Sequence, residues 1–434
     1  MEFPLESVKL RRAVLVASVA VAALVSFQAA RFWLAYHWID SERLEWMERG
    51  AALVPGNADS WDRLGRFRQW DFENPDVPRA IVDYQKTVQI DPLSARYWMD
   101  LAGAYETDGD GSRAQQAFER AKDVYPISAE VAWNHGNYLL RQQRTSEGYT
   151  EIRRAVRTDP KLLPLAISRT WRSSEDVNEL LDHVLPSDVD AYLQALDFFQ
   201  SIHAADPGLV VWERLASLGK PFALRRTFLF LEELIREDRA DDARHVWSGA
   251  LAAAGLPQEN SINHSVIYDG GFAQDFTNGG LGWRWDPPYT GGVAIDFDSA
   301  PPSKRGRSVR LEFSGGNNLS VEQPAQYVAV EPNRTLHFHA WIRTEGITTE
   351  SGMRFSIVDP RHPNEVNVAT ENLTGSNPWT AVDAEVTTGS DTHFVIVRLL
   401  RPPSRLFENK LSGTVWIADV SLVPSSTEEE SPSR

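Results

Sequence analysis

Hydrophobic residues follow three different patterns along the chain. Residues 13 to 30 form a continuous apolar stretch, residues 41 to 256 carry hydrophobic positions at helical spacing, and residues beyond 260 form short alternating segments between glycine-rich turns. A period near 3.6 is typical of amphipathic helices, and a period of two is typical of β-strands. The sequence therefore predicts a multidomain chain in which a helical region precedes a β-structure.

The apolar stretch is long enough to cross a lipid bilayer, because residues 13 to 30 span about 27 Å of helix at 1.5 Å per residue. Basic residues at 9, 11 and 12 precede it, and aromatic residues at 32, 33, 36 and 38 follow it. Basic residues before a span favour a cytoplasmic N-terminus. We expect a transmembrane helix over residues 13–34 that acts as a signal anchor in the inner membrane. Residues 1–12 would form a cytoplasmic tail, and the rest would be extracytoplasmic, in the periplasm.

A cleaved signal peptide is the alternative to a retained anchor. Cleavage requires small residues after the apolar stretch. Phe27 and Gln28 fit that requirement poorly, and Ala20, Val21 and Ala22 lie inside the apolar stretch. The sequence favours the anchor, and in both cases residues from 41 onward should be exported.

A group of small and aromatic residues recurs every 34 positions. The clearest unit contains Trp98, Leu101, Ala102, Tyr105, Ala114, Phe118, Ala121 and Pro126. The next unit keeps Gly136, Gly148, Ile152, Ala155 and Pro160. The preceding unit keeps Trp61, Leu64, Gly65, Ala80, Tyr84 and Pro92 once three residues are added in its loop. This pattern resembles the tetratricopeptide repeat (TPR), a family of stacked helical hairpins.

The resemblance implies a TPR-type α-solenoid over residues 41–256. Small residues let the two helices of a hairpin approach each other, and a proline ends the second helix. Residues 41 to 54 should form a solitary second helix before the first full hairpin. Helical spacing continues over residues 177–184, 188–203, 209–218 and 222–236. The last of these segments should pair with residues 241 to 254, whereas the hairpin register within residues 161 to 220 stays open.

In such arrays the first helix of each hairpin lines an inner groove. The residues expected to face it, and to bind a protein partner, are Arg66, Gln69, Trp70, Arg96, Met99, Glu106, Trp133, Asn137 and Arg141. Basic and aromatic side chains are common anchors in protein interfaces. The alternative for any single residue is an ordinary solvated surface position.

The last part of the chain is expected to form a β-sandwich over residues 260–424. Strands are predicted over residues 309–313, 327–330, 336–344, 353–358, 381–387, 394–400 and 415–422. The order of the motifs YDGGF at 268, GLGWRW at 280, RGRSVRLEF at 305 and GTVWIADVSL at 413 resembles carbohydrate-binding modules of the galactose-binding-like jelly-roll type. That resemblance implies a structural calcium ion. This chain has Ala273 where the family has an acidic residue, and its last strand offers only Asp419.

Two groups of residues are candidates for glycan binding, because sugars are recognised by flat aromatic faces beside planar polar groups. One is the segment Trp283, Arg284, Trp285, Asp286 and Tyr289. The other is the polar side of the strand at 336–344, with His337, His339, Trp341 and Arg343. The alternatives are core packing for Trp283 and Trp341, and solvated surface positions for the two histidines. Trp416 is expected in the core.

Composition narrows the function further. Hydrophobic content of 42% and charged content of 24% are typical of folded domains, although residues 425–434 should form a disordered acidic tail. A net charge of -16 disfavours nucleic-acid binding. The chain contains no cysteine. No nucleophile elbow, metal-protease or phosphate-loop motif is present, so we expect no enzyme, metal or cofactor.

These observations favour a membrane-anchored scaffold that docks a protein through its helical groove and contacts a polysaccharide through its β-domain, by analogy in bacterial envelope polysaccharide assembly or export. The alternatives are a purely structural assembly factor whose β-domain binds no sugar and, less favoured, a glycan-active enzyme.

Overall fold

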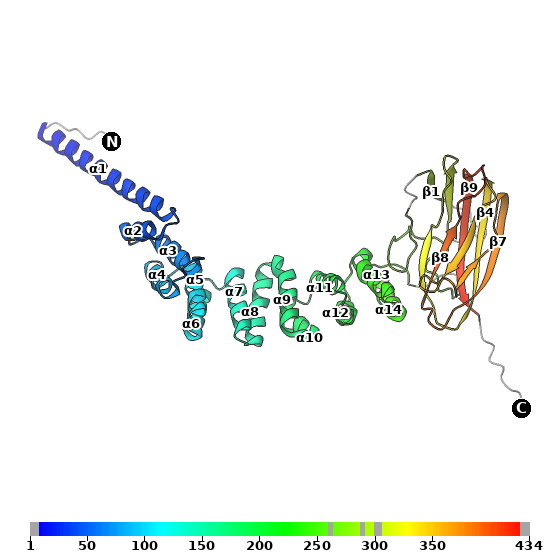
Figure 1. Cartoon of the computed structure of the whole chain (residues 1–434), viewed down its shortest axis with the longest axis horizontal. Coiled ribbons are helices and arrows are strands. Elements are labelled where there is room, and N and C mark those ends of the chain that lie inside the picture. Colours follow the sequence, from blue (N-terminus) through cyan, green and yellow to red (C-terminus); the bar gives the residue numbers. More distant parts are fainter. Residues whose placement is uncertain (1–7, 259–263, 287–290, 299–305, 426–434) are drawn as a thin grey trace, which may run out of the picture. The chain divides into compact units, whose positions relative to one another are not determined.

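The computed structural model describes residues 8–258, 264–286, 291–298 and 306–425 (Figure 1). It divides into two compact units, Met1–Pro186 and Ser187–Arg434. Helices precede two antiparallel sheets along the chain, as the change of hydrophobic pattern predicts. The units are described separately below.

The first unit contains helical hairpins with the predicted repeat. Its helices are α1 (Val8–Ile39), α2 (Leu44–Leu53), α3 (Ala58–Trp70), α4 (Val77–Ile90), α5 (Ala95–Thr107), α6 (Gly111–Val124), α7 (Ala129–Arg141), α8 (Thr145–Thr158), α9 (Leu163–Ser174) and α10 (Val177–Glu179), which continues as the π-helical turn η2 (Leu180–Val184). The second helices α4, α6 and α8 begin at residues 77, 111 and 145, which are 34 residues apart. The helix pairs α3–α4, α5–α6 and α7–α8 are therefore TPR-like. The three added residues lie in the α3–α4 loop, since residues 71–76 stand where the next hairpin has 108–110.

Small residues let the helices of each hairpin approach closely. A Cβ atom on Gly136 of α7 would stand 2.8 Å from Cγ1 of Ile152 and 3.0 Å from the carbonyl oxygen of Gly148, both in α8. A Cβ atom on Gly148 would stand 2.8 Å from Cδ2 of Leu140 in α7. Ala102, Ala114, Ala121 and Ala155 are completely buried. The predicted reason for the small residues is thus confirmed.

Helix α1 is longer than the predicted membrane segment and takes part in the repeat stack. Residues 41–54 were expected to contain a solitary helix, but α2 pairs with the last turns of α1. Ala35 and Ile39 are buried there, and a Cβ atom on Gly50 of α2 would stand 2.8 Å from the carbonyl oxygen of Ala35. The last turns of α1 therefore act as the first helix of an additional hairpin.

The second unit begins with further hairpins. Its helices are α11 (Val189–Ser201), α12 (Ala205–Ser217), η3 (Leu224–Thr227), α13 (Phe228–Arg236) and α14 (Ala240–Ala253). The helices of α5–α6, α7–α8 and α11–α12 all begin 16 residues apart, at 95 and 111, 129 and 145, and 189 and 205. This spacing resolves the register that the sequence left open. Helices α13 and α14 form the predicted last hairpin.

Two antiparallel sheets follow in the same unit. The strands are β1 (Val293–Asp298), β2 (Ser308–Ser314), β3 (Ala325–Ala329), β4 (Thr335–Ile347), β5 (Arg354–Val358), β6 (Asn367–Ala369), β7 (Gly375–Thr387), β8 (Phe394–Leu400) and β9 (Ser412–Pro424). One sheet has the order β1-β2-β9-β4-β7 and the other β3-β8-β5-β6. Their apolar side chains share one core, in which the rings of Phe338 and Phe355 are 5.1 Å apart. All seven predicted strands are present. The sequence analysis missed β1, which is only half-buried, and β6, which is three residues long.

Gly136→Ala is expected to destabilise the α7–α8 hairpin by about 1–3 kcal/mol, because the new methyl group overpacks the contact with Ile152 and Gly148. The measurement is urea unfolding of the full chain, followed by helical circular dichroism. The control is Gly103→Ala in α5, where nothing lies within 4 Å of the new methyl group. It should stabilise the helix by up to about 1 kcal/mol. Equal effects of the two substitutions would contradict the close-approach explanation.

Candidate functional site

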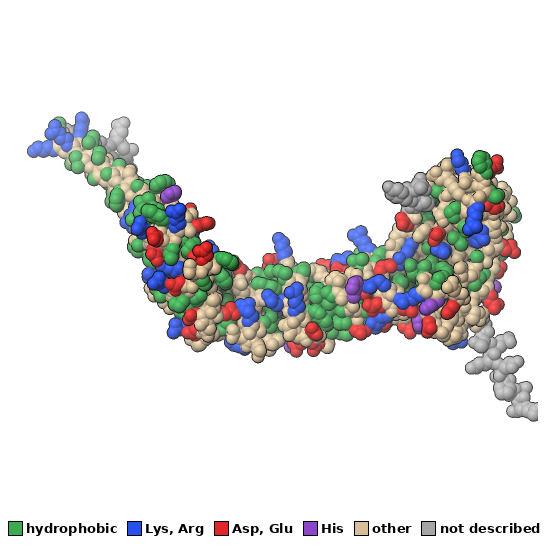
Figure 2. All heavy atoms as spheres, viewed as in Figure 1, with side chains coloured by type: hydrophobic (Ala, Val, Ile, Leu, Met, Phe, Trp, Pro, Cys, Tyr) green, Lys and Arg blue, Asp and Glu red, His purple; other side chains and the backbone are tan. Residues whose placement is uncertain are grey.

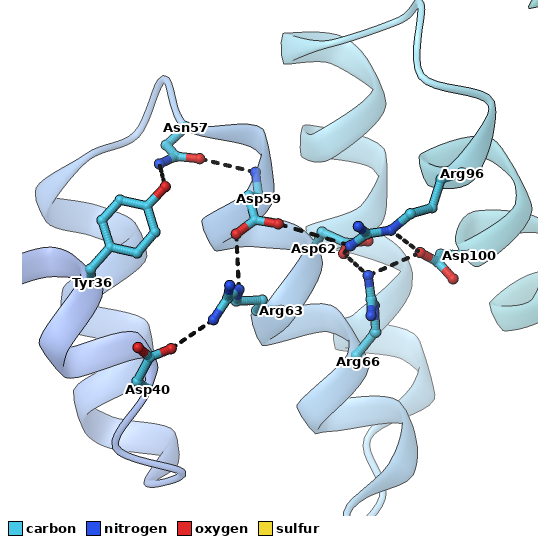
Figure 3. A network of polar contacts seen from close by, with 9 residues as sticks. All are labelled: Tyr36, Asp40, Asn57, Asp59, Asp62, Arg63, Arg66, Arg96 and Asp100. Carbon is cyan, nitrogen blue, oxygen red and sulfur yellow. Dashed lines mark hydrogen bonds and ion pairs between the residues drawn. The ribbon is translucent and has the colours of Figure 1, made fainter. Parts of the chain in front are cut away.

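The predicted groove residues on α3 and α5 form a network of ion pairs between neighbouring repeats (Figure 3). Asp62 of α3 is completely buried and lies at its centre. It accepts a hydrogen bond of 2.7 Å from Nη2 of Arg96 in α5 and another from Arg66 in its own helix. Arg66 also lies 3.5 Å from Asp100 of α5. Arg66 and Arg96 are therefore engaged within the protein.

The next pair of repeats is joined in a similar way. Arg141 of α7 donates two hydrogen bonds to Glu106 of α5, at 2.7 and 2.8 Å. Asn137 is buried and donates to the carbonyl oxygen of Trp133, at 2.8 Å. Gln69 is also buried, where its side chain accepts a hydrogen bond from Tyr84. Expecting Asn137 and Gln69 on an open groove was wrong, because both are needed inside the hairpin packing.

Trp70 is the predicted groove residue that remains most available for a partner. It lies at the end of α3 and is 71% exposed, and Phe72 in the following loop is completely exposed. Trp133 is half-buried, and Met99 lies against Asn134 of the next repeat. The ion pairs hold the repeats in register, so an apolar group at the end of α3 is the accessible part of this surface.

Burial changes the proton affinity of the acidic pair in this network. Desolvation raises the pKa of both Asp62 and Asp100, and the nearby charge of Asp100 raises the pKa of Asp62 further, while Arg66 works in the opposite direction. Asp62 Oδ1 and Asp100 Oδ2 are buried without a hydrogen-bond partner among the described residues. Proton uptake at this pair therefore relieves repulsion inside the joint.

The first predicted glycan group is not assembled as a surface site. Trp283 is 2% exposed and packs on Phe272, with ring centres 5.2 Å apart. Arg284 binds Glu232 of α13 at 2.6 Å, and its guanidinium lies over the ring of Tyr327. Trp283 and Arg284 are thus used for packing, which corrects their assignment as sugar ligands. In the same segment Trp285 packs partly against the core, Asp286 is exposed, and Tyr289 lies outside the described residues.

The second predicted glycan group lies on the outward side of β4. Leu336, Phe338, Ala340 and Ile342 point into the core, and the alternate residues point away from it. His339 Nδ1 lies 2.8 Å from Asp383 of β7, and His337 lies 3.4 Å from the same carboxylate. The edge of the Trp341 ring contacts His339. These side chains form a continuous polar and aromatic surface.

Trp416 of β9 extends this surface. Its expected place in the core was wrong, because the register Arg343↔Trp416 puts it on the outward side of the sheet. The Arg343 guanidinium lies 4.4 Å from the centre of the Trp416 ring, and Trp416 Nε1 donates to Asp298 at 2.7 Å. We call His337, His339, Trp341, Arg343, Asp383 and Trp416 the sheet surface.

The residues at the calcium position of the resembled family do not fit that ion. Calcium prefers six or more oxygen ligands. Ala273 supplies no side-chain oxygen, and the neighbouring Asp269 accepts the backbone N–H groups of Ala273 and Gln274, each at 2.8 Å. Within the described part of the chain, no group of three or more His, Asp or Glu side chains is placed to hold a metal ion.

The second unit also contains a cavity of about 450 Å³ between the last helices and the sheets. Glu233 is buried in its wall, 3.1 Å from His203 Nδ1 and hydrogen-bonded to Arg236. Burial works to raise the pKa of Glu233, but the hydrogen bonds from Arg236 and His203 outweigh it and lower the pKa. Arg361 from the sheets binds the carbonyl oxygen of Arg236. These contacts join the two parts of the unit, and no catalytic arrangement follows from them.

A further cavity, of about 590 Å³, was missed by the sequence analysis. The loop between β8 and β9 contributes Leu406, Phe407 and Lys410, and the loop after β4 contributes Thr348 and Glu350. Phe407 is completely exposed. An aromatic residue inside a proline- and serine-containing loop at 402–407 was the available signal in the sequence.

No protein-family model matches the chain, and no curated protein matches its sequence. Among solved structures, MamA is 13% identical and matches with a TM-score of 0.26, covering 45% of this chain and 89% of MamA. PilF of Pseudomonas aeruginosa is 18% identical, with a TM-score of 0.25, covering 45% of this chain and 90% of PilF. Similarities at these TM-scores carry no functional inference, so the TPR-like region is defined here by its own helix spacing and packing.

The raised pKa values predict that the free energy of unfolding falls as pH rises. The folded state binds protons on Asp62 and Asp100 at higher pH than the unfolded chain does, so stability decreases between the ordinary aspartate pKa and the raised ones. Asp100→Asn should make this decrease smaller, as measured by urea unfolding at several pH values between about 4 and 8. Asp123→Asn, at an exposed position of α6, is the control and should leave the pH dependence unchanged. An unaltered pH dependence in Asp100→Asn would refute the assignment.

Proposed function

We propose that the chain is a membrane-anchored, non-catalytic scaffold. One observation carries the proposal: the apolar part of α1 is completely exposed and continues without a break into the helical hairpins. Its most apolar 18-residue window has a mean hydropathy of 2.2. Figure 2 shows hydrophobic side chains along this helix and basic side chains at its N-terminal end. A bilayer removes such a surface from water, and the basic end favours the cytoplasm.

The helical hairpins would then lie on the periplasmic side of the inner membrane and dock a protein partner. The support for docking is the surface formed by Trp70 and Phe72, since large exposed aromatic residues are frequent energetic anchors of interfaces. The ion pairs of Asp62 and Glu106 neutralise the arginines around it. The partner should therefore offer an apolar segment to Trp70.

The β-domain would contact a glycan through the sheet surface. We interpret its two sheets as a jelly-roll β-sandwich similar to carbohydrate-binding modules. The support is the row formed by Trp341, Trp416 and Arg343 with the His337–His339–Asp383 group, which supplies aromatic faces beside hydrogen-bonding groups. Assembly or export of envelope polysaccharide is the setting that fits this combination. A β-domain that binds no sugar is the second candidate, and the use of Trp283 and Arg284 in packing favours it.

Photo-crosslinking in cells tests the anchor and the docking surface together. A photoreactive residue at Trp70 is expected to give a defined crosslinked species in membranes washed with alkaline carbonate. The same residue at Arg120, exposed on the second helix α6, is the control and should give none. Adding Trp70→Ala to a purified pair should weaken binding by on the order of 2 kcal/mol, roughly thirty-fold. A full-length chain found in the soluble fraction would refute the anchor, and a failure to crosslink at Trp70 would refute the docking surface.

Glycan binding is tested by an array screen with the full chain in detergent. Trp341→Ala should remove binding of any glycan that the native chain retains, because a stacking face is lost. Trp341→Phe should keep most of it, since the ring remains. If the native chain binds no glycan, the β-domain is better explained as a protein-binding or structural part of the scaffold.

A further inference from the structure

The connections between consecutive hairpins of the first unit carry exposed apolar side chains at equivalent positions. Leu93 lies in the turn between α4 and α5 and is 80% exposed. Ile127 lies 34 residues later, in the turn between α6 and α7, and is 70% exposed. Tyr125 in that turn is 51% exposed. Single apolar residues on a surface are common, but these recur with the period of the repeat. We call Leu93, Tyr125 and Ile127 the turn edge.

The backbone of these turns is satisfied by the protein's own side chains. Trp98 Nε1 donates to the carbonyl oxygen of Pro92 at 2.9 Å. Trp61 makes the same bond to Pro55 at 3.1 Å, and Arg154 donates to the carbonyl oxygen of Pro126. A surface next to lipid must satisfy its backbone polar groups internally. The turn edge therefore combines exposed apolar side chains with occupied proline carbonyl oxygens.

Helix α1 leaves the stack at this same edge. Helices joined by short turns run antiparallel, so α1, α3, α5 and α7 all run in one direction. Asn57 at the start of α3 donates to the Tyr36 hydroxyl at 3.4 Å, and Arg63 pairs with Asp40 at 2.6 Å (Figure 3). The segment 36–40 thus runs beside the start of α3. The N-terminal continuation of α1 must pass the edge that carries the turns before α3, α5 and α7.

The edge lies close to the expected membrane boundary. Residue 30 ends the apolar stretch, and Ala35 is buried in the stack. Five residues of helix rise about 7.5 Å, which is similar to the thickness of one headgroup layer. Leu93 at the start of α5 is two helix spacings from α1, or roughly 20 Å to the side. Lys161 takes the equivalent place in the next connection and is exposed, where an ammonium group suits lipid phosphates.

We propose that the turn edge inserts into the headgroup layer of the bilayer that α1 crosses, so that the repeat stack lies against the membrane surface. This inference rests on the proposed membrane anchor. The occupant of the apolar edge is lipid, because the helix that leaves at this edge is the one long apolar helix among the described residues. The opposite edge, with Trp70 and Phe72, faces away from the bilayer and stays available to a partner.

The absence of native cysteine makes the test direct, because each introduced cysteine is unique. The full-length variants Leu93→Cys, Ile127→Cys, Val21→Cys and Phe72→Cys are labelled with an environment-sensitive fluorophore. They are reconstituted into phosphatidylcholine and phosphatidylglycerol vesicles that contain spin-labelled lipid. Val21 reports the anchor, and Phe72 is the matched exposed apolar control at the opposite edge.

We expect spin-labelled lipid to cause loss of fluorescence at Val21 and Leu93, a smaller loss at Ile127, and none at Phe72. Loss at Val21 without loss at Leu93 and Ile127 would overturn the turn-edge proposal and leave the anchor intact. No loss at Val21 would overturn the anchor, and the turn-edge proposal with it. Equal loss at Phe72 and Leu93 would overturn the assignment of one membrane-facing edge.

Discussion

The close approach of two helix backbones is the constraint on which the first unit depends. At Gly136 and Gly148 there is no room for a Cβ atom without displacing the neighbouring helix. Because the helices are this near, each hairpin presents a flat side to the next and the large side chains Tyr84, Phe118 and Tyr138 fill the space between hairpins. The 34-residue period is the consequence in sequence, and every surface on the stack inherits it.

The same constraint connects the anchor to the stack. Gly50 allows α2 to pack against the backbone of α1 at Ala35, so the apolar helix ends as part of a hairpin. A flexible linker would let the repeats move freely relative to a membrane, whereas a continuous helix fixes one edge of the first unit toward it. A membrane-embedded α1 would thereby determine which surfaces can meet soluble partners.

The sequence predicted those features that depend on local spacing. The repeat period, the three-residue insertion and the inward alternation of β4 are all set by neighbouring positions. The use of Arg66 and Arg96 was not predicted, because their acidic partner is chosen by a contact between repeats. Opposite charges 34 and 35 residues apart, at Asp62 with Arg96 and Glu106 with Arg141, were the available signal. Trp283 and Trp416 were assigned to the wrong sides because loop packing and strand register bring distant segments together.

The internal ion pairs determine how selective a docking surface can be. Once Arg96 is held by Asp62 and Arg141 by Glu106, a charged partner would have to displace a formed pair and regain its desolvation cost. An apolar segment that covers Trp70 meets no such competition. The net charge of -16 adds to this argument, since it repels acidic partners at long range. Specificity on the helical unit is therefore expected to come from shape and apolar contact at the end of α3, with the charges between repeats kept for holding the stack in register.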